Sequence, residues 1–134
     1  MRISKFFTAL ALIGLTVPAL AADRTNAKSE ADLAKRLENR VAGKPVPCLN
    51  QRDLGSSEVI PGVAIVYEIG NTLYVNRPSG ASSLENDDIL ITRTTTTQLC
   101  RMDSVRLVDR GAGFEHGFVI LNDFVPYTKV KSKS

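Results

Sequence analysis

Apolar residues concentrate at residues 63–77, and their spacing predicts a β-hairpin. Two runs of β-branched and aromatic residues are separated by Gly70 and Asn71, and glycine at the first turn position takes a positive φ without steric cost. A two-residue turn pairs Tyr67 with Tyr74 and leaves apolar side chains on both faces. The hairpin therefore needs cover on both sides. A three-residue loop is the alternative, but it asks the following threonine to take a left-handed conformation.

A second pattern predicts one amphipathic helix at residues 29–43. Leu33, Leu37 and Val41 recur at the four-residue interval that places side chains on one helical face. Ser29 is a suitable N-cap, and a glycine followed by a proline gives a stop signal at the other end. The apolar stripe is narrow, and its expected role is to cover one side of the hairpin.

The remainder of the chain alternates short apolar runs with Gly, Pro, Asn and Asp. These runs predict strands at residues 48–54, 58–60, 88–95, 104–109 and 118–121. Five to seven short strands without intervening helices predict a mainly β fold, a small antiparallel barrel or sandwich with one N-terminal helix. Four threonines at residues 94–97 are expected in an exposed strand end, and a binding edge for a polymer or peptide is the alternative.

The start of the chain is typical of a signal peptide, predicted at residues 1–21. Arg2 and Lys5 precede an apolar run of roughly 12 residues, and a small-x-small pattern ends at Ala21. A bilayer-spanning helix needs about 20 apolar residues, so a retained membrane anchor is the weaker interpretation. The mature chain is expected to have no transmembrane segment and to be periplasmic in a bacterium.

The expected organisation after cleavage is a single domain with flexible ends. Residues 22–28 are predicted to be a flexible N-terminus, residues 29–127 the helix-plus-β domain, and residues 128–134 a flexible basic tail. Lysine occupies every second position of this tail, which is expected to be a solubilising end. Contact with anionic envelope surfaces is the alternative.

Charge argues against nucleic-acid binding by the mature chain. The formal net charge of the whole sequence is +3. Removal of Arg2 and Lys5 with the signal peptide lowers this value to about +1, because each carries one positive charge. A basic patch able to neutralise phosphates is therefore not expected.

The two cysteines, Cys48 and Cys100, are predicted to form one disulfide. Export places them in an oxidising compartment, and no third thiol competes for either. Closing the loop of roughly 53 residues between them stabilises the fold by about 4 kcal/mol in the chain-entropy model.

Candidate chemistry is sparse, and no catalytic, metal-binding or cofactor-binding residue is expected. His116 is the only histidine and is interpreted as a surface turn residue, because no nucleophile motif accompanies it. The acidic residues at 85–88 are expected to solvate the entrance to a strand, with weak calcium binding as the alternative. A hydrolase using paired carboxylates would draw on Asp87, Asp88, Asp103, Asp109 and Glu115.

Three short motifs carry a resemblance. Cys48 opens the domain, a Cys-x-x-Asp motif follows at residues 100–103, and a Phe-x-Pro motif lies at residues 124–126. This pattern resembles small exported proteobacterial proteins of unknown function. The resemblance implies that Asp103 orders a turn and that Phe124 and Tyr127 anchor the last segment. It implies no activity.

The function expected from the sequence is that of a non-enzymatic periplasmic binding or accessory protein. Its ligand is not specified by any motif. An envelope protein, a cell-wall component or an inhibited enzyme are the candidate partners. The alternative is a small hydrolase of envelope polymers that uses the carboxylates named above.

Overall fold

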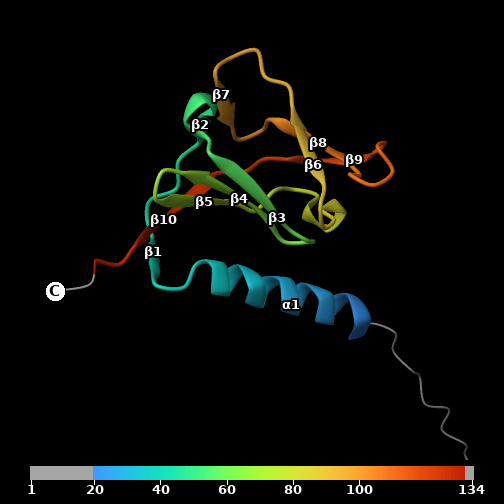
Figure 1. Ribbon diagram of the computed structural model, residues 1–134, viewed down its shortest axis with the longest axis horizontal. Helices are drawn as coiled ribbons and strands as arrows, with labels where there is room; N and C mark the ends of the chain where they lie inside the picture. The colour runs from blue at the N-terminus through green and yellow to red at the C-terminus, as the bar shows by residue number, and fades with distance from the viewer. Residues whose placement is uncertain (1–19, 132–134) are drawn as a thin grey trace, which may run out of the picture.

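The computed structural model describes residues 20–131 and arranges them in layers around one five-stranded sheet (Figure 1). This sheet has the order β1-β10-β5-β4-β3, and two smaller antiparallel sheets, β2-β7 and β6-β8-β9, lie on one side of it. Helix α1 (Leu20–Arg36) lies on the other side. The strands are β1 (Arg40–Ala42), β2 (Cys48–Asn50), β3 (Ser56–Ile60), β4 (Ala64–Ile69), β5 (Thr72–Asn76), β6 (Ile89–Thr92), β7 (Gln98–Cys100), β8 (Ser104–Val108), β9 (Glu115–Ile120) and β10 (Phe124–Lys129).

The predicted hairpin is confirmed, including its register. Strands β4 and β5 pair Ile69 with Thr72 and Tyr67 with Tyr74, as a two-residue turn requires. Gly70 has a φ of 57°, in the region where glycine carries no steric penalty. The three-residue alternative is therefore wrong.

Both faces of the hairpin are covered, as its apolar pattern demanded. On one face Leu33 of α1 belongs to a buried cluster with Val66, Leu73 and Val75. The other face contributes to a larger buried cluster with the two small sheets, containing Leu49, Ile65, Tyr67, Leu84, Leu99, Val105, Leu107, Val119, Leu121 and Phe124. The mainly β, antiparallel fold is confirmed, but the sheets do not close into a barrel.

The helix begins and ends earlier than predicted. It includes residues 22–28, which were expected to be flexible, and Ser29 is a buried residue within the helix rather than its cap. The helix ends at Arg36, and Asn39 then takes a φ of 60°. Asparagine tolerates this left-handed conformation better than most residues, so it can turn the chain out of the helix. Val41 consequently lies on β1 and is exposed.

The predicted flexible tail begins too early, because Thr128 and Lys129 belong to β10. Thr128 pairs with Val41, and Lys129 pairs with Arg40. Pro126 lies within this strand, and proline removes one ladder donor. The alternation of bonds along β5 directs position 126 away from β5, however, so no bond to that strand is lost.

The disulfide is confirmed: Cys48 and Cys100 are directly paired across β2 and β7, with a sulfur–sulfur distance of 2.05 Å. The predicted strands are present with shifted ends, and residues 94–97 form the loop between β6 and β7 instead of a strand end. Nearly all of the predicted signal peptide, residues 1–19, lies outside the described residues. Within residues 20–131, no helix is both long and apolar enough to cross a membrane.

Candidate functional site

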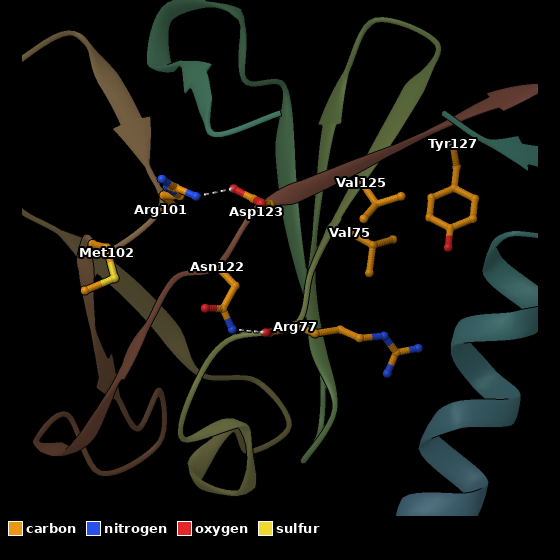
Figure 2. A pocket seen from close by; sticks show the side chains of 8 residues that line it. All are labelled: Val75, Arg77, Arg101, Met102, Asn122, Asp123, Val125 and Tyr127. Carbon is orange, nitrogen blue, oxygen red and sulfur yellow. Dashed lines mark hydrogen bonds and ion pairs between the residues drawn. The ribbon is translucent and has the colours of Figure 1, made fainter. Parts of the chain in front are cut away.

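A groove of about 520 Å³ lies beside α1, where β5 and β10 meet the turn between β7 and β8 (Figure 2). We call it the β5–β10 groove. It is lined by Val75, Arg77, Arg101, Met102, Asn122, Asp123, Val125 and Tyr127. The sequence patterns assigned none of these residues to a site. Tyr127 was expected only to anchor the last segment.

The floor of the β5–β10 groove is apolar because of strand register. Val75 and Val125 are direct partners across β5 and β10, so their side chains share one face of the sheet. Tyr127 lies two residues beyond Val125 and therefore on the same face. Tyr127 also packs against the buried cluster that contains Leu33 of α1. The helix thus covers part of this sheet face, and the groove is the part beside it.

Two arginines, Arg77 and Arg101, lie on opposite sides of this apolar floor. Arg77 follows β5 and reaches α1, where its two terminal nitrogens lie 2.6 and 3.0 Å from the carboxylate oxygens of Glu30. This bidentate hydrogen bond lowers the pKa of Glu30. Arg101 on the opposite side lies 3.7 Å from Asp123, and both side chains are largely exposed. Exposed pairs of this kind contribute little to stability, so Arg101 can exchange Asp123 for an external acid.

Backbone hydrogen bonds and the disulfide fix the turn that carries Arg101 and Met102. The backbone N–H of Cys100 donates to Oδ2 of Asp103 at 2.7 Å, which confirms that Asp103 orders a turn. The N–H of Arg101 donates to the carbonyl of Pro47 at 2.7 Å, and that of Met102 to the carbonyl of Leu121 at 2.8 Å. The disulfide fixes the start of the same turn.

Met102 is the unusual residue of this turn. Its φ is 74°, a left-handed conformation that is uncommon for residues other than glycine and asparagine. Its side chain is 74% exposed at the rim of the β5–β10 groove. The fold therefore presents a long apolar side chain to solvent from a constrained backbone.

A buried asparagine joins the end of β5 to the loop before β10. The Nδ2 of Asn76 donates to the carbonyl of Asn122 at 2.6 Å, and its Oδ1 accepts from the N–H of Asn122 at 3.1 Å. Asn122 in turn donates from Nδ2 to the carbonyl of Arg77. Sequence reasoning missed Asn76, because a polar residue ending a strand is usually a turn signal.

Most of the carboxylates considered for a hydrolase are occupied by separate local contacts. Asp103 accepts a hydrogen bond from the turn before β8, Asp109 accepts one within the loop before β9, and Glu115 pairs with Arg106. The contact between Glu115 and Arg106 lowers the pKa of Glu115. These three residues therefore serve local structure at three different places.

Asp87 and Asp88 line one hollow, but Asp88 has no free oxygen. Its Oδ2 accepts from the backbone N–H of Glu85 at 2.8 Å, and its Oδ1 lies 2.7 Å from Nε2 of His116. His116 lies on β9, so its assignment to a turn was wrong. Ligand atoms of Glu85, Asp88 and His116 lie within 4.8 Å of one another, a clustering that the sequence did not indicate. The protein's own hydrogen bonds account for the position of Asp88 in it.

Comparison with known proteins finds no family model, no curated protein and no solved structure that matches this chain. The resemblance to small exported proteobacterial proteins therefore stays a prediction. The residue roles that it implied can be compared with the structure directly: Phe124 is fully buried, and Tyr127 packs against the cluster under α1.

Proposed function

We propose that the chain is a non-enzymatic binding or accessory protein of the bacterial periplasm, and that its partner binds in the β5–β10 groove. Met102 is the observation that carries this proposal. A non-glycine residue with positive φ costs of order 1 kcal/mol and persists where the surrounding structure over-determines it. The backbone hydrogen bond from Met102 to Leu121 holds this conformation, whereas the methionine side chain, left 74% exposed, adds little buried apolar surface to the fold. Contact with a partner would bury the exposed Met102 side chain, and methionine adapts well to irregular apolar surfaces.

The lining of the groove defines the chemistry of the partner. Val125 and Tyr127 offer an apolar floor, and Met102 extends this surface at the rim. Arg101 is available to an acidic group once it leaves Asp123, since that pair is long and exposed. The partner surface is therefore partly apolar with an acidic group beside it. An envelope protein or a peptide-bearing cell-wall component fits this description.

The periplasmic location rests on two features of the chain. Residues 1–21 have the pattern of a signal peptide, and the disulfide between Cys48 and Cys100 is the kind of bond that persists in oxidising compartments. Cleavage after Ala21 leaves nearly all of α1, including Glu30 and Leu33, in the mature chain.

The hydrolase alternative receives no support from the placement of its carboxylates. A paired-carboxylate mechanism needs one acid and one base or nucleophile facing a common substrate. Four of the five candidates make contacts with neighbouring groups of the protein.

Site-specific photo-cross-linking in the periplasm tests the proposal. Benzoylphenylalanine at position 102 is expected to trap a partner in the envelope fraction, because this position lies at the rim of the groove. Position 118 is the matched control, since Phe118 is also an exposed apolar residue but lies on β9 outside the groove. Equal cross-linking from the two positions, or none from position 102, would contradict the assignment of the groove.

A further inference from the structure

Two strand edges face each other on the side of the molecule away from the β5–β10 groove. Strand β3 is one of the two outer strands of the five-stranded sheet, and β6 is an outer strand of the three-stranded sheet. A hollow of about 400 Å³ is lined by Ser56 and Ser57 of β3 together with Leu90 and Thr92 of β6. We call the space between these strands the β3–β6 seam.

A second hollow continues the seam. It has a volume of about 480 Å³ and is lined by residues of β3 and by the start of β6. Ser57 and Leu90 line both hollows, so the two are neighbours along the same pair of edges. The seam is thus the place where the sheets fail to close into a barrel.

The hairpin register shows which backbone groups of β3 face the seam. Ile69 and Thr72 close the two-residue turn and exchange both of their backbone hydrogen bonds. Because these bonds alternate along an antiparallel strand, Val66 and Glu68 direct theirs toward β3. Their partners on β3 are Glu58 and Ser56. The backbone N–H and C=O groups of Ser57 and Val59 therefore point away from β4, toward the seam.

Tyr67 supplies a second and independent observation. Its side chain is 4% exposed, its ring meets that of Phe124 edge-on with 5.7 Å between centroids, and it lines the first hollow. Its hydroxyl is buried and has no hydrogen-bond partner among residues 24–131. Leaving such a group unsatisfied destabilises the folded protein. A ligand that reaches the hydroxyl recovers this free energy.

We propose that the β3–β6 seam binds an extended polypeptide segment as an added strand. Its backbone pairs with the outward groups of Ser57 and Val59, as in other proteins that capture peptides at a free sheet edge. One of its side chains enters the first hollow and hydrogen-bonds the hydroxyl of Tyr67.

The lining selects the kind of side chain that fits this hollow. Leu54, Leu90 and Leu99 are apolar, whereas Gln51 and Thr92 are polar. A side chain with an apolar stem and a hydroxyl or amide end matches both, so threonine, asparagine or glutamine is expected there. A polypeptide is favoured over a glycan because only the polypeptide repeats N–H and C=O groups along an extended strand.

This inference goes beyond the proposed function, because it concerns a different surface and its failure leaves the β5–β10 groove unaffected. The probe is a phage-displayed library of random linear seven-residue peptides, selected against the purified oxidised protein. Recovered peptides are resynthesised, and their dissociation constants are measured by fluorescence anisotropy. Perturbed amide signals of β3 and β6 in NMR spectra are expected to locate the bound peptide.

Two substitutions at one position separate backbone pairing from other contacts. Ser57→Pro removes the outward N–H without removing a bond to β4, and proline is tolerated at such edge positions. It is expected to weaken peptide binding at least tenfold, whereas Ser57→Ala keeps the N–H and is expected to bind within twofold of wild type. Tyr67→Phe is expected to weaken binding about fivefold or more, with an unchanged or higher melting temperature because an unpaired hydroxyl is removed.

Three results would overturn the inference. One is the recovery of no peptide above background. Another is peptide binding that is equally tight in Ser57→Pro and Ser57→Ala. The third is a preference of the seam for peptidoglycan glycan fragments over every recovered peptide, which would assign the hollow to a different class of ligand.

Discussion

His116 on β9 and Asp88 in the loop before β6 form a contact, with 2.7 Å between Nε2 and Oδ1. The carboxylate of Asp88 is almost completely buried, and its second oxygen accepts from the backbone N–H of Glu85. One side chain therefore holds the loop before β6 against β9. The hydrogen bond to Asp88 raises the pKa of His116, because it favours the imidazolium, and desolvation opposes this effect only in part.

Stability is expected to fall as pH rises above about 6.5, the ordinary pKa of histidine. The folded-state pKa lies above the unfolded one, so the stabilisation is complete below 6.5 and is lost as pH passes through the higher folded value. Melting temperatures between pH 5.5 and 9 measure this. His116→Gln is expected to flatten the profile, since the chain has no other histidine. An identical dependence of melting temperature on pH in the variant would show that His116 is not its source.

Reduction of the disulfide is expected to destabilise the protein by about 4 kcal/mol. The bond links residues separated by 52 positions, and opening it restores chain entropy to the unfolded state. Urea denaturation of the Cys48→Ser, Cys100→Ser double variant measures the loss. The same variant should weaken partner cross-linking at position 102, because Cys100 fixes the turn that presents Met102. A difference below about 1 kcal/mol would show that the bond contributes little.

Leu33→Ala is expected to cost about 2–5 kcal/mol, the usual range for removing a fully buried leucine. Leu33 is the buried residue through which α1 joins the cluster on the hairpin. Lys35→Ala is the matched control, because Lys35 is exposed on the same helix. Chemical denaturation of both variants checks the prediction. Equal stability of the two would mean that α1 is not docked on the sheet.

Truncation of the C-terminus is expected to separate β10 from the residues that follow it. Removing residues 128–134 deletes the pairing of Thr128 with Val41 and of Lys129 with Arg40, so the melting temperature should fall. Removing only residues 132–134 should leave it within about one degree, because the pairing of β10 with β1 ends at Lys129 and stays complete. An unchanged melting temperature after the longer truncation would show that β1 and β10 do not need each other.

Local patterns in the sequence were sufficient to predict the hairpin and the disulfide. The Gly70-Asn71 turn determines the register of β4 and β5, because a three-residue loop would require Thr72 to take a left-handed conformation. Two cysteines in a chain that is predicted to be exported leave a single pairing. Both inferences depend on neighbouring or unique residues rather than on tertiary context.

The helix ends and the last strand could not be predicted in the same way. Residues 40–42 leave the helical pattern because they pair with β10, which lies more than eighty residues later. The polar stretch before Ser29 contains no apolar stripe, so nothing local marked it as helical. Pro126 is tolerated in β10 because its position directs the missing N–H away from β5, and no local pattern indicates that direction.

The candidate site was even less accessible to sequence reasoning. The β5–β10 groove joins residues from β5, the turn before β8 and β10, and no motif connects these segments. Met102 is informative only once its backbone conformation and exposure are known. Tyr67 was correctly placed in a strand, but the burial of its unpaired hydroxyl depends on tertiary packing.

The yield of partner cross-linking from position 102 in groove variants measures the proposed function most directly. Val125→Lys places a charge on the groove floor, and a lysine stem can leave this half-buried position without disturbing the core. Phe118→Lys places the same charge on an exposed apolar residue elsewhere. We expect Val125→Lys to lower the yield at least tenfold at an unchanged melting temperature, and Phe118→Lys to leave it unchanged. Equal yields from the two variants would contradict binding in the β5–β10 groove.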